Sequence, residues 1–343
     1  MKKKIKALLL LGLVFLGGCG QASAPSVSSA GTDSQSVDLF AMDTAMTLTA
    51  YGDHAEDALA GAKSEIERLD ALFSISSESG DIYALNRDHA VTLHEDTQAL
   101  LKRALEVSDS TDGIFDCTIE PVMDAWGFTT QNYRVPSADE LQQLLTHVDY
   151  KQVQQNGSDV SIPADVQVDL GGIAKGYTSD RIMQVFADNG VTSGIVSLGG
   201  NVQALGCKPD GSKWRVAVQD PNDEGENFAV VEIADEAVIT SGGYQRYFED
   251  NGRTYHHIID PRTGTPADSG VISSTIISHG GTLADGLSTS LFIMGVDDAL
   301  DYWRAHKEEF DAILMDKDGT AYVTEGIADR CSLLEDRKMQ VVH

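Results

Sequence analysis

The order of the predicted helices and strands constrains the fold of this chain most. In the first half, apolar residues recur at helical spacing. This spacing predicts helices over residues 54–73, 97–108, 138–145 and 174–188. A strand is predicted over residues 39–51, where threonines alternate with apolar side chains.

Short strands dominate the rest of the chain. Runs bounded by turn residues predict strands over residues 166–170, 195–198, 214–218, 228–233, 237–241, 255–259 and 272–278. Hairpins are predicted over residues 151–162 and 312–324, with turns at Asn156-Gly157 and Asp318-Gly319. Two further helices are expected over residues 282–294 and 298–310. Helices mixed with short strands indicate an α+β fold with mixed, mainly antiparallel sheets and flanking helices.

The N-terminal residues are expected to lie outside this fold. Residues 1–18 combine four lysines with an apolar run, which is typical of a secretory signal and is too short for a membrane span. The run ends in Leu16-Gly17-Gly18-Cys19, which resembles a bacterial lipobox, so we expect Cys19 to be lipidated. An ordinary signal peptide with a chance cysteine is the alternative.

The segment after Cys19 is small, polar and aperiodic, so residues 19–37 are interpreted as the lipidated cysteine and a flexible tether. Residues 38–343 remain as the folded domain. A lipid anchor and a tether would hold this domain at the extracytoplasmic face of the cell membrane.

Charge excludes one class of partner. The chain has 25 Lys and Arg against 53 Asp and Glu, a formal net charge of −28. A phosphate backbone would be repelled by such a surface, so we expect no nucleic-acid binding. An anionic ligand would need a local device, such as a metal ion or a helix N-terminus.

Three cysteines, Cys117, Cys207 and Cys331, remain after Cys19. They are far apart in the sequence, and neither a CxxC pair nor a Cys/His zinc spacing is present. We therefore expect no structural zinc. Two alternatives stay open for these three cysteines: one disulfide with one free thiol, or three buried thiols.

The most informative motif is the stretch DLGGIAKGY, residues 169–177. It indicates a strand end, a glycine turn and a helix start, with Lys175 in the first turns of the helix. The free N–H groups and the dipole of such a helix suit a phosphate group. Taken alone, a purely structural glycine turn explains the stretch equally well.

Two other stretches hold candidate chemistry. In the stretch YHHIIDPRTG, adjacent His256 and His257 must face opposite sides of a strand, and a histidine with Asp260 could form a base and its partner. On a predicted helix, Asp285 and Thr289 share one face at i, i+4 and offer hard oxygen ligands for Mg²⁺ or Ca²⁺. Taken alone, a strand end and a favourable first-turn aspartate explain both.

Three more stretches, GIFD…WGF, SLGGN and TSGGYQR, each read as turns when taken singly. In their order along the chain, together with DLGGIAKGY, HHIIDPRTG and ADGLSTSLFIMG, they resemble the ApbE family of FAD:protein FMN transferases. The likeness covers about residues 40–295 and continues toward the C-terminus.

The resemblance implies an ApbE-like fold and an Mg²⁺-dependent enzyme that uses FAD as substrate. Such an enzyme transfers the FMN moiety to a Thr or Ser hydroxyl of an acceptor protein and releases AMP. The acceptors implied are membrane redox subunits or extracellular flavoproteins. An FAD pyrophosphatase that gives FMN and AMP, and a flavin-binding lipoprotein without activity, are the alternatives.

The resemblance also assigns residues. The metal ligands implied are Asp285, Thr289 and the backbone carbonyl of Ala174. The catalytic histidine of the H-x-x-D-P motif falls on His257, and we expect Asp260 to orient it as the base. The FAD contacts implied are Met42, Gly80, Asp81, Ile82, Asp116, Lys175, Tyr177 and Ile259. Where the family usually has Met-Gly-Thr, this chain has Met42-Asp43-Thr44, which leaves the local backbone in question.

Overall fold

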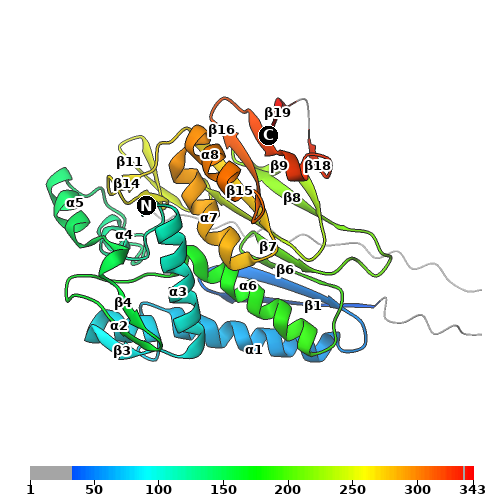
Figure 1. Cartoon of the computed structure of the whole chain (residues 1–343), viewed down its shortest axis with the longest axis horizontal. Coiled ribbons are helices and arrows are strands. Elements are labelled where there is room, and N and C mark those ends of the chain that lie inside the picture. Colours follow the sequence, from blue (N-terminus) through cyan, green and yellow to red (C-terminus); the bar gives the residue numbers. More distant parts are fainter. Residues whose placement is uncertain (1–32, 335–336) are drawn as a thin grey trace, which may run out of the picture. The chain divides into compact units, whose positions relative to one another are not determined.

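Nine strands pair into one sheet (Figure 1), in the order β1-β2-β6-β7-β10-β15-β16-β17-β19. The structure is a computed structural model that describes residues 33–334 and 337–343. The strands are β1 Ser34–Ala41, β2 Thr44–Tyr51, β6 Gly194–Leu198, β7 Asn201–Leu205, β10 Ala237–Gly242, β15 Val271–Ser278, β16 Asp311–Asp316, β17 Ala321–Thr324 and β19 Met339–Val342. Neighbouring strands are antiparallel except β17 and β19, which are parallel. The predicted α+β class with mainly antiparallel sheets is confirmed.

Helices cover one face of this sheet. They are α1 Ala55–Phe73, α3 Glu95–Ser110, α6 Gly171–Asp188, α7 Gly281–Met294 and α8 Val296–His306. Because successive strand residues point to opposite faces, Ile239, Ile276 and Leu314 pack into the same core as these helices. Their neighbours Val238, Ile277 and Ile313 face the other way.

The other face is covered by a second sheet of three strands, β8 Trp214–Asp220, β9 Asp223–Ile233 and β18 Cys331–Leu333. The central strands are thus buried on both faces, which explains why nearly every residue of β15 is buried, its serines and threonine included.

Smaller elements complete the described chain. The helices α2 Asp81–Asp88, α4 Glu120–Trp126 and α5 Ala138–Leu144 lie with the small sheet of β3 Ala90–Thr92, β4 Gln154–Asn156 and β5 Asp159–Ser161 at one end of the molecule (Figure 1). Two further strand pairs are β11 Tyr247–Asp250 with β12 Arg253–His256, and β13 Ile259–Asp260 with β14 Thr265–Pro266.

Three predictions about strands need correction. The strand expected over residues 39–51 is a hairpin, because the chain turns at Met42 and Asp43, whose φ angles are 48° and 58°. Its first strand begins at Ser34, so the folded domain starts before the expected residue 38. Residues 166–170 form no strand, because the backbone N–H and C=O of Val168 are both hydrogen-bonded to the Asn86 side chain.

The long helices and both predicted hairpins are confirmed. The hairpin turns at Gly157 and Gly319 have φ angles of 62° and 78°, which glycine adopts without strain. Cys117, Cys207 and Cys331 are all free thiols.

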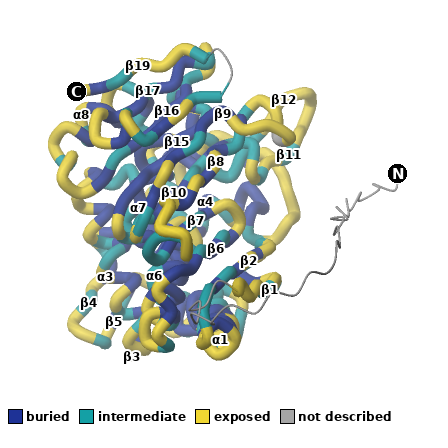
Figure 2. Tube along the Cα trace, turned by 90° about the vertical axis from the view of Figure 1, so that its right-hand side faces the viewer, coloured by how far each residue is buried: buried dark blue, intermediate teal, exposed yellow. Residues whose placement is uncertain are grey.

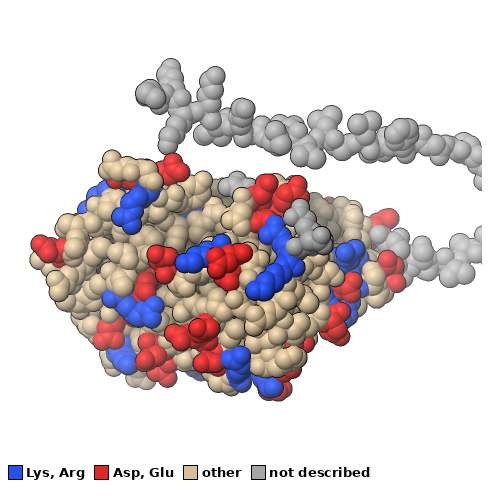
Figure 3. All heavy atoms as spheres, turned by 90° about the horizontal axis from the view of Figure 1, so that it is seen from above, with Lys and Arg blue, Asp and Glu red and all other residues tan. Residues whose placement is uncertain are grey.

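The signal segment, Cys19 and most of the expected tether lie outside the described residues. Within the described residues, no helix is both long enough and apolar enough to cross a bilayer. On the face seen in Figure 3, lysine and arginine side chains lie scattered among aspartates and glutamates. That face offers no continuous row of cations to a phosphate backbone.

The Met42-Asp43 turn gives a test of backbone strain. A β-branched residue at φ 58° is strained, whereas Asn tolerates this region. We expect Asp43→Val to lower the free energy of unfolding by about 1–2 kcal/mol relative to Asp43→Asn. Urea unfolding of both variants measures the difference, and equal stability would contradict the turn.

Candidate functional site

The site is built on a close crossing of helices α6 and α7 at two glycines. A Cβ atom on Gly176 would lie 2.2 Å from the carbonyl oxygen of Gly281, and one on Gly281 would lie 2.7 Å from the carbonyl oxygen of Gly176. Only residues without side chains allow this approach, so backbone meets backbone at the crossing.

Asp180 of α6 caps the N-terminus of α7. Its carboxylate accepts hydrogen bonds from the backbone N–H groups of Gly281 and Thr282, at 2.7 and 2.8 Å, and from the Thr282 hydroxyl at 2.5 Å. A helix start normally finds its cap in its own chain segment. Here the cap comes from the neighbouring helix, so it also fixes α7 against α6.

Asp285 lies one turn into α7, and its side chain is buried at 4% exposure. One carboxylate oxygen accepts a hydrogen bond from the backbone N–H of Gly176 and the other from the side-chain amide of Asn201, both at 2.8 Å. Both donors are neutral, and no ion pair reaches this carboxylate from the described residues. A buried carboxylate without a cation is costly, so its surroundings fit a bound metal ion.

Further oxygen donors come from residues that the sequence predicted. The Ala174 carbonyl, in the first turns of α6, accepts a hydrogen bond from the Thr178 hydroxyl at 2.8 Å. The Thr289 hydroxyl lies 3.2 Å from the Ser241 hydroxyl. Among the described residues no three His, Cys, Asp or Glu side chains cluster as a metal site. Carboxylate, hydroxyl and carbonyl oxygens are the donors that Mg²⁺ prefers.

His257 follows strand β12, and its ring lies beside two cations. Its Nδ1 is 3.1 Å from the backbone carbonyl oxygen of Arg246, which leaves Nε2 as the other proton site. Burial of the ring lowers the pKa of His257 to about 3, and the positive charges of Arg246 and Lys175 add to this effect. The fold thus places His257, Lys175 and Arg246 within electrostatic reach of one another.

Arg246 is a site residue that the predicted site did not include. Its guanidinium lies 5.9 Å from the centre of the Phe128 ring. Neither Arg246 nor Lys175 forms an ion pair with the described part of the chain. The only sequence signal was its place at the end of TSGGYQR, a stretch that resembled a turn.

Two acids border these cations. Burial raises the pKa of Glu120 to about 9, and the neighbouring charges of Asp169 and Asp124 act in the same direction. Burial also raises the pKa of Asp169, although Arg246 and Lys175 oppose this. Burial thus favours the uncharged form of Glu120, and Asp169 is the acid that lies near both cations beside His257.

Helix α6 departs from its predicted start. It begins at Gly171, so Gly171 and Gly172 of DLGGIAKGY lie within its first turn. The Gly171 N–H donates to the Asp169 carboxylate at 2.8 Å, and the Leu170 carbonyl accepts from Ile173 and Ala174. A Cβ on Gly172 would lie 3.1 Å from the Phe115 ring. The expected free N–H groups are thus largely occupied, and Gly172 serves packing.

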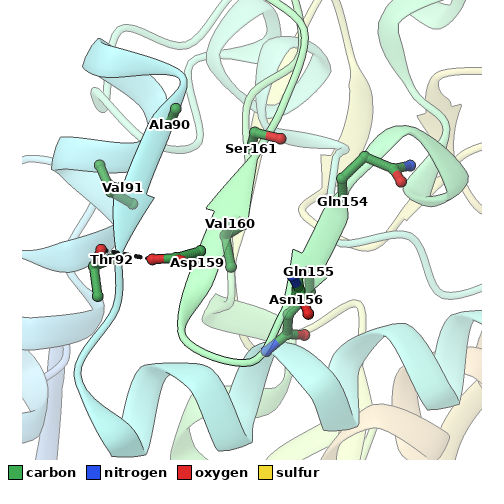
Figure 4. A pocket seen from close by; sticks show the side chains of 9 residues that line it. All are labelled: Ala90, Val91, Thr92, Gln154, Gln155, Asn156, Asp159, Val160 and Ser161. Atoms are coloured by element: carbon green, nitrogen blue, oxygen red, sulfur yellow. Dashed lines mark hydrogen bonds between the residues drawn. The ribbon is translucent and has the colours of Figure 1, made fainter.

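One open cavity lies away from these residues. It measures about 540 Å³ and is lined by strands β3, β4 and β5, with the Thr92 hydroxyl donating to Asp159 across it (Figure 4). None of the predicted site residues lines it.

Known proteins were compared with the chain. A family model described as the ApbE family matches residues 42–314. The chain belongs to the ApbE family. An FAD:protein FMN transferase of Treponema pallidum is 34% identical over 295 residues, covering 79% of this chain and 80% of that protein. One of Escherichia coli is 28% identical over 335 residues and covers 93% and 94%.

Solved ApbE structures share the fold. The ApbE protein of Thermotoga maritima has a TM-score of 0.81 at 32% identity, covering 86% of this chain and 98% of that one. The apo flavinyl transferase ApbE of Pseudomonas stutzeri has a TM-score of 0.75 at 27% identity, covering 84% and 93%.

Asp260 was expected to orient His257, but in the structure the two side chains have different partners. The Asp260 carboxylate faces Arg262, which donates to it at 2.7 and 2.9 Å, and also accepts the Arg262 backbone N–H. His257 instead contacts the Arg246 carbonyl. The Asp260-Pro261 turn thus shapes the segment after His257, while Arg246 orients the ring.

The residues predicted to contact FAD fall into two groups. Met42, Tyr177 and Lys175 surround the α6 start, where the Met42 sulfur accepts the Thr178 hydroxyl at 3.6 Å and the Tyr177 hydroxyl donates to Asp96 at 2.7 Å. Ile259 is buried among Trp126 and Phe128.

The second group serves local structure. The Asp116 carboxylate accepts hydrogen bonds from Thr118 and Tyr150. Gly80 has no room for a side chain, since a Cβ would lie 2.7 Å from the Ala71 carbonyl. The Asp81 carboxylate holds His94, and Ile82 is fully buried. These side chains thus hold local structure together, and their contact with FAD stays a prediction.

The glycine crossing predicts a large effect of one methyl group. Gly176→Ala should lower the free energy of unfolding by about 1–3 kcal/mol, because the added Cβ overlaps the Gly281 carbonyl. Gly280→Ala is the matched control, since a Cβ there meets nothing within 4 Å. Urea unfolding of both variants measures this, and equal loss would contradict the close crossing.

The lowered pKa of His257 predicts a pH dependence. Between pH 6.5 and about 3 the unfolded chain binds a proton on this ring and the folded chain does not, so this group lowers stability as the pH falls. His257→Asn should flatten the fall in unfolding free energy over that window. An unchanged pH profile in the variant would contradict the buried, neutral ring.

Proposed function

We propose that this ApbE-family chain is an FAD:protein FMN transferase. It moves the FMN moiety of FAD to a Thr or Ser hydroxyl of an acceptor protein and releases AMP. The names of the related proteins support this reaction. The observation that carries it is the neutral His257 beside two unpaired cations, Lys175 and Arg246.

The reaction exchanges the phosphoanhydride bond of FAD for a phosphoester bond to the acceptor. A bond forms between the acceptor oxygen and the phosphorus of the FMN half. The bond from that phosphorus to the bridging oxygen breaks, and the oxygen leaves with AMP. The hydroxyl proton must be removed as the new bond forms, because a Thr hydroxyl is a poor nucleophile at neutral pH.

Lys175 and Arg246 bind the pyrophosphate of FAD. Neither side chain forms an ion pair with a described residue, although the Asp169 carboxyl lies near both, so their N–H donors can meet an anion. The chain as a whole carries −28 and has no general attraction for such a substrate. Affinity is therefore concentrated in these two side chains and in the metal site.

Asp285, Thr289 and the Ala174 carbonyl hold Mg²⁺, which supplies positive charge to the scissile pyrophosphate when it is bound. The uncompensated burial of Asp285 supports this assignment. Gly176 and Asn201 orient the carboxylate, and Asp180 fixes the helix that carries it.

His257 accepts the proton of the acceptor hydroxyl at Nε2. In the free protein, two neighbouring positive charges oppose protonation of the ring. An anionic substrate on Lys175 and Arg246 offsets these charges and raises the proton affinity of His257. The base is thereby strengthened when FAD is in place.

The protein acts at the outer face of the cell membrane, anchored through a lipid on Cys19. The four lysines, the apolar run and the lipobox-like Leu16-Gly17-Gly18-Cys19 support this placement. Acceptors in the same compartment, such as membrane redox subunits or extracellular flavoproteins, would then be within reach.

The test uses purified protein, FAD, Mg²⁺ and a soluble acceptor domain, with mass spectrometry for FMN on Thr or Ser. His257→Asn should slow transfer by about 10²–10⁴-fold and leave FAD binding near the wild-type value. Asp285→Asn should abolish turnover and its dependence on Mg²⁺. His279→Asn, an exposed histidine bonded to the Asp235 carbonyl, is the control.

Free FMN and AMP without a modified acceptor would identify a pyrophosphatase. FAD binding without AMP release would identify a binding protein. Transfer retained in His257→Asn would reject the base, and Mg²⁺-dependent turnover retained in Asp285→Asn would reject the metal site.

A further inference from the structure

A row of aromatic side chains leads away from His257. We call Phe128, Tyr133, Phe248 and Tyr255 the aromatic row. The Phe128 ring centre lies 6.3 Å from that of His257 and 5.7 Å from that of Tyr133. Phe248 stacks on Tyr133 at 5.1 Å and on Tyr255 at 5.3 Å.

The aromatic row packs on Trp126 and on Arg246. Trp126 lies beneath it, 5.3 Å from Tyr255 and 6.2 Å from Phe248, and its indole N–H donates to the Gly264 carbonyl at 2.7 Å. Arg246 at the base contacts both the Phe128 ring and His257. The rings are therefore held in place before any partner arrives.

The outer part of the row is open to solvent. Tyr133 is 41% exposed. Phe248 and Tyr255 lie on the β11–β12 ribbon, whose two strands pair only with each other among the described strands. Figure 2 shows the ribbon as a mostly exposed segment beyond the main sheet. Phe248 and Tyr255 are partly buried against Trp126, and Tyr133 is the exposed ring of the row. An exposed aromatic ring held by such a base is typical of an interaction surface.

The openness of the row favours a polypeptide over a small molecule. Small ligands are bound in concave sites that enclose most of their surface. Protein partners bind open surfaces through rigid aromatic anchors. The reaction also requires that a segment of another protein reach His257, and the row is continuous with that residue.

We propose that the aromatic row is the docking surface for the acceptor protein, which lays the segment around its Thr or Ser along these rings. This inference rests on the proposed transferase function. The hydroxyl lies at His257, and an apolar or aromatic side chain of the same segment packs on Tyr133.

The geometry sets the spacing on the acceptor. Tyr133 is two ring contacts from His257, of 5.7 and 6.3 Å. An extended segment advances about 3.3 Å per residue. The side chain that meets Tyr133 should therefore lie about two to four residues from the modified Thr or Ser.

The test compares two exposed tyrosines. Tyr133 belongs to the row, whereas Tyr247 is 45% exposed and pairs with His256, so it lies on the opposite face of the ribbon. The probe is a soluble acceptor domain that another ApbE-family protein flavinylates on Thr. Rates of FMN transfer to this domain and equilibrium binding of FAD are measured for Tyr133→Ala, Tyr133→Phe and Tyr247→Ala.

We expect Tyr133→Ala to raise the KM for the acceptor domain about tenfold, with FAD binding unchanged. Tyr133→Phe keeps the ring and should restore most of the affinity, and Tyr247→Ala should behave as wild type. An unchanged acceptor KM in Tyr133→Ala overturns the docking surface. Weakened FAD binding in that variant assigns the row to the flavin and also overturns it.

A wild-type chain that modifies no acceptor would instead reject the transferase function, and the docking surface with it. Loss of acceptor affinity in Tyr133→Ala, with FAD binding and kcat unchanged, supports a lost contact with the acceptor. The two failures are therefore distinguishable within one set of measurements.

Discussion

The contact between Gly176 and Gly281 is the constraint on which the site depends. It brings the backbones of two helices together so closely that the Gly176 N–H reaches the Asp285 carboxylate. Asp180 then ties the start of one helix to the body of the other. The metal donors, Lys175 and the helix cap all lie within a few turns of this crossing, so its geometry is transmitted to each of them.

Electrostatics explains how an acidic protein can manage an anionic substrate. The positive charge is local, because Lys175 and Arg246 face a neutral histidine and a Glu120 that burial keeps protonated. The negative charge of Asp285 is held by neutral donors. Charge is therefore arranged residue by residue in the site, and the sign of the whole surface has little influence there.

Much of the fold followed from periodicity. The long helices repeat apolar residues clearly. Asn156-Gly157 and Asp318-Gly319 mark the turns of the two predicted hairpins. The turn at Met42 and Asp43 could not be recognised in the sequence, because apolar residues continue on both sides of it. The glycine that would mark a turn is replaced by Asp43. Residues 166–170 have the composition of a strand, but a distant side chain, Asn86, satisfies their backbone.

The site was partly predictable for the same reason. Asp285 and Thr289 share a helix face, so their placement follows from local geometry, whereas His257 lies just after strand β12, where the alternation of a strand no longer applies. Arg246 and Asp180 act across the fold, and local spacing carries no trace of such contacts. Asp260 illustrates the converse, since a suggestive spacing to His257 is satisfied by Arg262 two residues away.

The free cysteines have a consequence for redox chemistry. Cys117 and Cys331 are buried, and burial raises both thiol pKa values, that of Cys331 to about 11. Thiolates are the reactive form, so both groups resist oxidation at neutral pH. The described fold contains no disulfide among these residues and owes its stability to packing. The packing around Cys117 and Cys331 therefore does not depend on a disulfide at either residue.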